Sequence, residues 1–378
     1  MLCTMVVGRS VATTSRLSAD LDQHASNYGR KRVVIAIRQI IFVLDVVIFS
    51  ILEKNSPHKS RITTEFGPPS SRPRIACTME IQGIPIDDNF AEAFDMTATR
   101  LVITAAEAPW AMRAAEAMTG FATSVIGCGI EAGIEKSLDP SETPDGRPGV
   151  AILAFSINQE TLQKQLEKRI GQCVLTCPST SVFAGLTSTR PMLLGAHIRY
   201  FGDGKQISKR IGSQRYWRIP VMDGEFVCQE SVYATKAVGG GNFLVLAKSI
   251  HGALHACQDA VEAIRKVPGC IAPFPGGVAR SGSKVGSKYK SLRASTNDAY
   301  CPTLQDQTQS FIVDGATACL ELVIDGLTPE SIAQAMRVGI LAACHRGKEL
   351  GVVKITGGNY GGKLGRHHFY LREILSNA

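Results

Sequence analysis

The chain has 378 residues, of which 44% are hydrophobic and 20% charged, an ordinary balance for a globular protein that excludes a fibrous or intrinsically disordered chain. This length is sufficient for two domains with substantial cores. The formal net charge is +8, but residues 1–78 carry 11 basic and 5 acidic side chains, so the rest of the chain has a net charge of only +2. That near-neutral balance argues against a nucleic-acid-binding surface.

Residues 1–78 differ in character from the rest of the chain. An apolar run from Val33 to Leu52 is long enough to cross a bilayer, but Arg38, Gln39 and Asp45 interrupt it. A charge at the centre of a membrane span costs about 2.5 to 3.5 kcal/mol, so a span here is marginal. No cleavage site of the signal-peptide type follows the run. We expect residues 1–78 to be an N-terminal extension from a reading frame begun too far upstream rather than a membrane anchor.

After Met79, short strand-like runs alternate with amphipathic helices. The first group of elements forms a strand–helix–strand unit, in which Asn158 is the expected N-cap of the second helix. In chain order we predict a strand at 101–104, a helix at 109–118, a strand at 150–155, a helix from Asn158 to Ile170 and a strand at 173–176.

The same order of elements recurs twice further along the chain. We predict strand 242–247, helix 253–267 and strand 269–272, then strand 318–324, helix 329–343 and strand 351–355, with a hairpin turn at residues 222–225. Hairpins combined with helices of about 15 residues predict an α+β fold, an α/β sandwich of mainly antiparallel sheets flanked by helices. We place a boundary near residue 226, between an N-terminal lobe (79–225) and a C-terminal lobe (226–378). The lobes should be tightly joined, because no Pro/Ser-rich linker separates them.

Residues 272–303 form the most informative segment, and they belong to the expected C-terminal lobe. The segment has almost no large aliphatic side chains and is dense in Gly, Ser, Thr, Asn and Lys, which indicates a loop that lines a site. A mobile surface linker is the alternative, but prolines around Phe274 and at Pro302 stiffen the segment. The candidate substrate-binding residues are Gly276, Gly277, Lys284, Lys288, Ser295, Thr296, Asn297 and Tyr300. Solvated surface charge is the alternative for the two lysines.

Motifs of several other enzyme classes are lacking. The glycine-rich run 357–365 follows a predicted strand, but no helix pattern follows it and its spacing fits neither a P-loop nor a dinucleotide-binding loop, so we predict turns there. The sequence contains no Gly-x-Ser-x-Gly elbow and no His-Glu-x-x-His pair. His251 and His255 share a predicted helix face, but without an adjacent acid they are more typical of surface or packing residues than of a metal site.

The eleven cysteines are scattered, and most lie inside apolar runs, which is typical of small buried thiols. Cys173 and Cys177 are the one close pair, and no second pair at zinc-ligand spacing accompanies them, so we predict no metal site. Reduced thiols favour a cytoplasmic location.

Several segments of the sequence closely resemble those of one protein family. The run "APFPGG…SKVGSK…ASTNDAYCPT" from Ala272 is similar to the formylmethanofuran:tetrahydromethanopterin formyltransferases, the one-carbon enzymes of methanogens and of formaldehyde-oxidising bacteria. The runs "IDDNFAEAFDMTATRLVITA", "TGFATSVIGCGIEAGIE", "ETPDGRPGV", "RIGQCVLTCPSTSVF", "GGGNFLVLAKS" and "GVVKITGGNYGGKLG" agree with it. The resemblance begins at Met79, itself a possible start, and continues nearly to the C-terminus.

The resemblance implies two similar ferredoxin-like lobes and transfer of a formyl group between a methanofuran-type amine and N5 of tetrahydromethanopterin. It implies that these two carriers are substrates and that the enzyme holds no bound cofactor or metal. It points to Glu321 as the residue that transfers the proton. The alternative is that Glu321 is a strand residue whose side chain faces solvent. Lys284 and Lys288 would meet the anionic parts of the carriers.

The bacterial members of the family imply partners as well: hydrolase subunits acting on formylmethanofuran, and a homo-oligomer, either dimer or tetramer. We expect a cytoplasmic protein that binds neither nucleic acid nor a membrane. Two other functions remain open. A non-catalytic scaffold subunit would have lost the 295–303 loop or Glu321, and both are present. A single-strand nucleic-acid binder would need exposed aromatic residues and a basic patch, and 6% aromatic content argues against it.

Overall fold

The structure is a computed structural model that describes residues 78–280 and 282–376. The apolar run 33–52 and the interpretation of the N-terminal extension lie outside the described residues. Among the residues described, no helix combines the length and apolarity needed to cross a bilayer.

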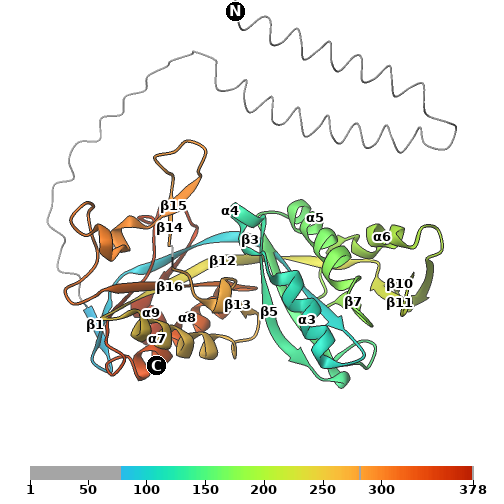
Figure 1. Ribbon diagram of the computed structural model, residues 1–378, viewed down its shortest axis with the longest axis horizontal. Coiled ribbons are helices and arrows are strands. Elements are labelled where there is room, and N and C mark those ends of the chain that lie inside the picture. Colours follow the sequence, from blue (N-terminus) through green and yellow to red (C-terminus); the bar gives the residue numbers. More distant parts are fainter. Residues whose placement is uncertain (1–77, 281, 377–378) are drawn as a thin grey trace, which may run out of the picture. The chain divides into compact units, whose positions relative to one another are not determined.

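Two long antiparallel strands run through both lobes (Figure 1). They are β3 (Phe90–Thr104) and β12 (Val232–Ala247), and they pair from Thr235 opposite Ala98 to Gly239 opposite Phe94. Beyond this paired stretch, β3 continues into the first lobe and β12 continues into the second. The two lobes therefore share one continuous, mainly antiparallel sheet.

The first lobe is built around the second half of β3. Its other strands are β4 (Thr123–Ser124), β5 (Ile130–Leu138), β6 (Gly149–Ser156), β7 (Ser181–Ala184), β8 (Arg190–Met192), β9 (Ile207–Ile211), β10 (Gln214–Val221) and β11 (Gly224–Gln229). Its helices are α3 (Ala108–Thr119), α4 (Val125–Cys128), α5 (Gln159–Arg169), the π-helical turn η3 (Ile170–Val174) and α6 (Leu194–Ile198). Short 3₁₀ turns lie at η2 (Pro140–Glu142) and η4 (Arg199–Gly202).

The second lobe is built around the second half of β12. Its other strands are β1 (Thr78–Ile81), β2 (Ile84–Asp87), β13 (Cys270–Ile271), β16 (Ala318–Gly326), β17 (Val352–Thr356) and β18 (His367–Tyr370), with a separate hairpin of β14 (Ser283–Val285) and β15 (Ala294–Thr296). Its helices are α7 (Ile250–Ile264), α8 (Pro329–His345) and α9 (Leu371–Ser376). Short 3₁₀ turns lie at η5 (Pro275–Gly277), η6 (Asp298–Tyr300) and η7 (Pro302–Leu304).

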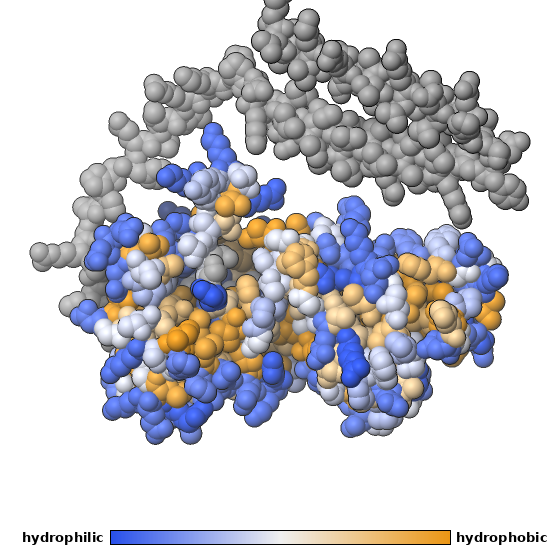
Figure 2. Space-filling model, in the orientation of Figure 1, coloured by the Kyte–Doolittle hydropathy of each residue, from blue (hydrophilic) through white to orange (hydrophobic). Residues whose placement is uncertain are grey.

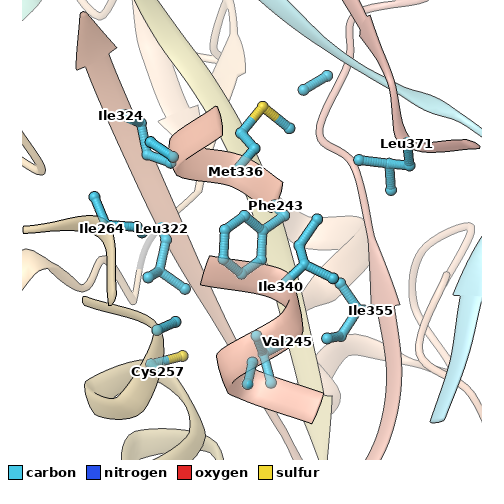
Figure 3. Close-up of a cluster of buried hydrophobic side chains, with 14 of the residues drawn as sticks. Phe243, Val245, Cys257, Ile264, Leu322, Ile324, Met336, Ile340, Ile355 and Leu371 are labelled. Carbon is cyan, nitrogen blue, oxygen red and sulfur yellow. The ribbon is translucent and has the colours of Figure 1, made fainter. Parts of the chain in front are cut away.

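Each lobe has its own apolar core. In the second lobe, one face of β12 and β16 packs against the helices α7 and α8. Figure 3 shows this arrangement, with strand residues Phe243, Val245, Leu322 and Ile324 beside Met336 and Ile340 of α8. Strand side chains alternate between faces, so the neighbouring residues Asn242 and Glu321 point to the opposite side of the sheet. The helices thus fix one face of the sheet as core and leave the other for a site.

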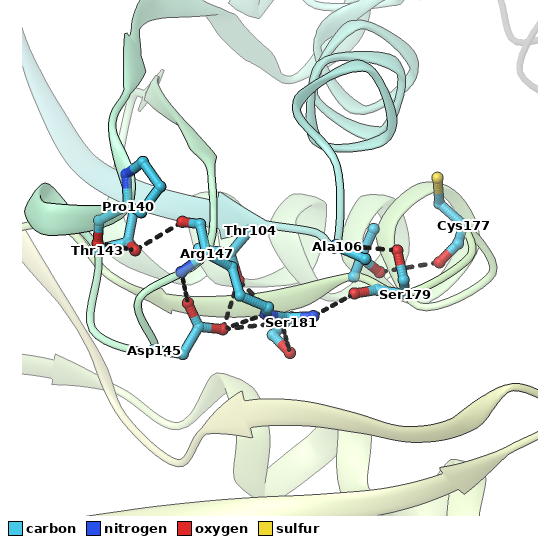
Figure 4. A network of polar contacts seen from close by, with 10 residues as sticks. Thr104, Ala106, Pro140, Thr143, Asp145, Arg147, Cys177, Ser179 and Ser181 are labelled. Carbon is cyan, nitrogen blue, oxygen red and sulfur yellow. Dashed lines mark hydrogen bonds and ion pairs between the residues drawn. The ribbon is translucent and has the colours of Figure 1, made fainter.

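A polar network holds the far end of the first lobe (Figure 4). The guanidinium of Arg147 donates hydrogen bonds to Asp145 Oδ2 (2.8 Å), to the Ser179 carbonyl oxygen (2.6 Å) and to Ser181 Oγ (2.7 Å). Thr104 Oγ1 also donates to Asp145 Oδ2, at 2.8 Å. The network ties the loop before β6 to β3 and β7, so it has a structural role away from the site described below.

Most of the predicted elements are confirmed with boundaries shifted by a few residues, but two strands are much longer than predicted. The strand β3 begins at Phe90 rather than at residue 101, and β12 begins at Val232 rather than at residue 242. Asn158 caps α5 by accepting a hydrogen bond from the Thr161 N–H at 2.8 Å, and β10 and β11 form the predicted hairpin. The α+β class, with two lobes and a mainly antiparallel sheet, is confirmed. The lobe boundary near residue 226, which lies within β11, stays a prediction.

The strand predicted at 173–176 is wrong. The helix α5 continues there into the π-helical turn η3, which the Leu175 N–H closes by donating to the Ile170 carbonyl oxygen at 2.8 Å. Val174 is buried in the first-lobe core, and a short apolar run does not distinguish a strand from a buried turn of helix. The next strand along the chain is β7.

Candidate functional site

Glu321 lies in the middle of β16 and is only 8% exposed. Cys319 and Val323 share its face of the strand, opposite the face that packs in the helical core. Tyr300 and Val313 cover this face by packing with Leu244. The alternative that Glu321 faces solvent is therefore wrong.

The carboxylate of Glu321 has a specific partner. Asn242 Nδ2 donates a hydrogen bond to Glu321 Oε1 at 2.7 Å, and Asn242 Oδ1 accepts one from the Gly358 N–H at 3.0 Å. Burial raises the pKa of Glu321 to about 7, although the bond from Asn242 lowers it. A carboxyl group with this pKa exchanges a proton readily near neutral pH.

The chain passes close to the carboxylate at Gly282. A Cβ added there would lie 2.9 Å from Glu321 Oε2, so only glycine leaves that space open. Backbone bonds hold the segment in place, because Ala279 and Glu321 exchange two N–H···O bonds and the Asn297 N–H donates to the Gly282 carbonyl oxygen at 2.6 Å. The 279–297 segment is thereby anchored beside the acid.

Glu321 lines two cavities. The smaller, about 20 Å³, is lined by Thr296, Asn297 and Tyr300 together with Glu321. The larger, about 490 Å³, is mainly apolar and includes Asn242 in its wall. Its other lining residues are Glu92, Phe94, Asp95, Met96, Ser124, Val125, Ile126, Glu131, Ile157, Gly239, Gly240, Phe274, Val285, Arg293, Ala294, Val323 and Tyr360.

Apolar side chains gather around the larger cavity. Ile126, Ile157 and Val285 are 58%, 64% and 58% exposed, respectively. Figure 2 shows hydrophobic surface beside the base of the β14–β15 hairpin, on the side toward the first lobe. An apolar cavity of this size with a few buried polar groups is typical of a small-molecule site.

Glu92 holds the glycine-rich loop 357–365 against the larger cavity. Its carboxylate accepts four backbone N–H bonds, from Tyr360 (2.8 Å), Gly362 (2.9 Å), Leu364 (2.6 Å) and Gly365 (2.5 Å). Burial alone would raise the pKa of Glu92, but these bonds together lower it. No helix follows the loop, and Gly361 and Gly362 have positive φ, as the predicted turns require.

The structure brings some predicted site residues together and separates others. Thr296, Asn297 and Tyr300 lie with Glu321 around the small cavity. Ser295 Oγ instead donates to the Gly286 carbonyl oxygen within the hairpin, at 2.9 Å. Gly276 and Gly277 line a separate cavity of about 650 Å³ between β5 and α7.

The two predicted lysines are on the hairpin of β14 and β15. Lys284 Nζ forms an ion pair with Asp298 Oδ1 at 2.9 Å, and both side chains are partly exposed. Lys288 is exposed in the turn that joins the two strands.

Sequence reasoning missed Asn242, Glu92 and Tyr360 as lining residues. Asn242 follows three glycines in "GGGN", an interruption of an otherwise apolar strand that marks an unusual position. Glu92 is an acid at a buried position of β3 between the buried Ala91 and Ala93, and no local pattern distinguishes it.

Comparison with known proteins gives consistent results. The family model described as "Formylmethanofuran-tetrahydromethanopterin formyltransferase" matches residues 79–221, and the model described as "FTR, proximal lobe" matches residues 224–374. A formylmethanofuran–tetrahydromethanopterin formyltransferase of Methylococcus capsulatus is 61% identical over 298 residues, which cover 79% of this chain and 100% of the relative. A component of the formyltransferase/hydrolase complex of Methylorubrum extorquens is 53% identical over 301 residues, covering 78% of this chain and 97% of that protein.

Two solved structures are also similar. One is a crystal structure of the Methylorubrum extorquens formyltransferase/hydrolase complex with methylofuran, with a TM-score of 0.77 and 52% identity over 79% of this chain and 99% of that chain. The other is a formylmethanofuran:tetrahydromethanopterin formyltransferase from Methanosarcina barkeri, with a TM-score of 0.74 and 45% identity over 79% of this chain and 100% of that chain.

Proposed function

The chain belongs to the formylmethanofuran–tetrahydromethanopterin formyltransferase family, and we propose that Glu321 transfers the proton in its reaction. The enzyme is an acyltransferase that moves a formyl group between a methanofuran-type amine and N5 of tetrahydromethanopterin. The observation that supports the role of Glu321 most strongly is that this buried residue lines two cavities, with its carboxylate oriented by Asn242.

Formyl transfer requires one proton to move from the attacking nitrogen to the departing nitrogen. The lone pair of the acceptor amine attacks the formyl carbon, and the carbonyl oxygen becomes an oxyanion. The Glu321 carboxylate takes the proton from the attacking nitrogen and then delivers it to the departing nitrogen as the old C–N bond breaks. A pKa of about 7 suits both steps, because the group gives up and regains a proton with little free-energy cost near neutral pH.

The residues around the small cavity are suited to stabilising the oxyanion. Asn297 carries amide N–H donors and Tyr300 a hydroxyl, and both lie beside Glu321. Burial raises the pKa of Tyr300 to about 12, so its hydroxyl keeps its proton and remains a donor. Donors held in position before the reaction are worth more than mobile ones, because they need no reorganisation as charge develops. We assign Thr296 to the same group of donors.

The larger cavity is suited to the flat ring system of a pterin. Its mostly apolar lining favours burial of a ring face. Lys284 and Lys288 on the hairpin would meet the anionic parts of the carriers. Gly276 and Gly277, beside the separate 650 Å³ cavity, would contact a more distant part of one carrier.

The assembly of relatives supports proposals about partners and location. The similar protein of Methylorubrum extorquens is part of a formyltransferase/hydrolase complex, and we extend that association to this chain. We further propose a homo-oligomeric, cytoplasmic enzyme that works without a bound cofactor.

A direct assay tests the proposed function. The purified full chain is mixed with formyl-tetrahydromethanopterin and methanofuran, and loss of the donor and formation of the formylated amine are followed together. Equal rates of loss and formation support formyl transfer. Donor loss without the formylated product would indicate hydrolysis and contradict formyl transfer. No loss of the donor would also contradict it and would favour the non-catalytic scaffold.

A further inference from the structure

Near the site, the side chains of β12 depart from the regular alternation between the two faces of the sheet. Val238 and Phe243 both lie in the second-lobe core although five positions separate them, which a regular strand does not permit. The pairing explains this, because Val238 lies opposite Gly326 and Gly241 lies opposite Ile324, so β12 holds one extra residue there. This β-bulge turns Asn242 to the face that carries Glu321.

Asp325 holds the bulge from the neighbouring strand. Its Oδ1 accepts a hydrogen bond from the Gly240 N–H at 3.0 Å, and Gly240 has a φ of +92°. A Cβ on Gly239 would collide with Met96 Sδ and would lie 2.8 Å from Asp325 Oδ1. The bulge is therefore closely packed around this one carboxyl group.

The carboxyl group of Asp325 also meets Glu131, on β5 of the first lobe. Asp325 is 0% exposed and Glu131 is 9% exposed, and the two carboxyl groups interact with each other. Asp325 Oδ2 is buried and has no hydrogen-bond partner when both groups are ionised. Glu131 Oε1 in turn accepts the Val125 N–H at 2.9 Å. Two carboxylates in contact repel each other, so the bond between them needs one proton, shared by the pair.

Burial raises the pKa of both groups, and the charge of Glu131 raises the pKa of Asp325 further. None of the ion pairs among the described residues includes either carboxyl group. The titratable or charged groups on the surrounding elements are Cys270 of β13, Glu135 of β5, Glu92 and Asp95 of β3, Glu321 of β16, Arg293 just before β15, and Tyr360 of the glycine-rich loop. Of these, Glu135 is paired with Arg100, and Asp95 with Arg366 and His367.

We propose that the Glu131–Asp325 pair is a positioning element of the transfer site. By sharing one proton it ties β5 to the bulge of β12 and holds Asn242 in hydrogen-bond contact with Glu321. The kinetic part of this inference rests on the proposed function, whereas the structural part does not. Neither residue needs to touch a substrate, because each acts through the backbone of β12.

The test compares two replacements of Asp325. In Asp325→Asn, the amide oxygen can still accept the Gly240 N–H, and the amide nitrogen can donate to the Glu131 carboxylate, so both links of the pair remain without a shared proton. Asp325→Ala removes both links. Asp314, an exposed acid, provides matched control variants, Asp314→Asn and Asp314→Ala. Circular dichroism confirms which variants are folded at the assay temperature.

We expect kcat to fall about 10²-fold in Asp325→Ala, as for a misplaced catalytic group, and to stay within a few-fold of the parent in Asp325→Asn. Amide hydrogen exchange of the peptide that contains Gly240 should be faster in Asp325→Ala and parent-like in Asp325→Asn. If Asp325→Ala has a lower melting temperature but the kcat of its folded form equals that of the parent, the pair affects only stability. That result would overturn the proposal.

The pH profile gives a second readout. At alkaline pH the parent loses the shared proton and the two carboxylates repel, so kcat should fall, whereas Asp325→Asn has no such proton to lose and should keep its activity to higher pH. Identical alkaline limbs, or an Asp325→Asn variant as impaired as Asp325→Ala, would overturn the proposal. If the parent protein transfers no formyl group, the proposed function fails, and the exchange of Gly240 still decides whether the pair holds the bulge.

Discussion

The amide nitrogen of Asn242 donates a 2.7 Å hydrogen bond to the carboxylate of Glu321, across two neighbouring strands of the second lobe. The same side chain accepts the Gly358 N–H, so it links the acid to the glycine-rich loop. Asn242 therefore orients one carboxylate oxygen and also moderates the pKa that burial raises.

Replacing Asn242 with Leu removes the amide group that donates a hydrogen bond to the buried carboxylate of Glu321. The pKa of Glu321, about 7 in the parent, should rise further, because the bond from Asn242 lowers it. The carboxylate form is needed to accept the proton, so the acidic limb of kcat/KM should move to higher pH. The measurement is a pH–rate profile of Asn242→Leu and its parent. In a Glu321→Gln background the same replacement should cause no shift, and a shift there would contradict the assignment.

Glu92→Gln tests the carboxylate that holds the 357–365 loop. Glutamine has one acceptor oxygen, and its NH₂ group meets backbone donors, so at least one buried N–H should lose its partner at a cost of about 1 to 3 kcal/mol in the free energy of unfolding. Urea unfolding measures this loss at pH 7. The exposed Glu80, replaced by Gln, is the control.

The effect of Glu92 should depend on pH in a defined direction. Its pKa is lowered on folding from an ordinary value of 4.5, so the ionised group stabilises the fold above pH 4.5, and this stabilisation is lost as the pH falls through the lowered pKa. The difference between parent and Glu92→Gln should therefore shrink on acidification. A difference that stays constant from pH 7 to pH 3 would show that the charge of Glu92 contributes nothing.

Lys284→Ala and Lys288→Ala test the role of the hairpin in binding. If these lysines meet anionic groups of the carriers, each replacement should raise KM for one substrate and make the remaining affinity less sensitive to salt, since ion pairs are screened. Lys205→Ala, an exposed lysine of the first lobe, is the control. Unchanged KM values for both carriers would place Lys284 and Lys288 on the solvated surface.

Much of the fold follows from local sequence patterns. The helix cap at Asn158, the hairpin at 222–225 and the alternation that buries Leu320 and Leu322 while turning Glu321 to the other face were all predictable, because each depends on neighbouring residues. The π-helical continuation of α5 was not, because burial of Val174 depends on the lobe packed around it.

The site was predictable only in part. Thr296, Asn297 and Tyr300 belong to a segment whose composition indicates a site, and the family resemblance indicates Glu321. Asn242 could not be placed, because a single inserted residue in the β-bulge decides which face it occupies. The pairing of Glu131 with Asp325 joins residues on different lobes, far apart in the chain, and only the tertiary fold brings them together.

Loss of the carboxylate should not destabilise the protein. The pKa of Glu321 is raised on folding, so the ionised group carries a penalty that is fully present above pH 7 and vanishes below pH 4.5. Glu321→Gln should therefore be as stable as its parent at pH 8, or more stable, by thermal unfolding. A large loss of stability would identify Glu321 as a structural hydrogen-bond partner instead.

Steady-state kinetics of Glu321→Gln test the central claim most directly. Gln keeps the shape and the bond from Asn242 but cannot exchange the proton, so kcat for formyl transfer should fall by about 10² to 10⁴-fold with KM little changed. Glu349→Gln, at an exposed position, should behave like the parent. A Glu321→Gln enzyme whose kcat stays within a few-fold of the parent value would contradict the assignment of proton transfer to Glu321.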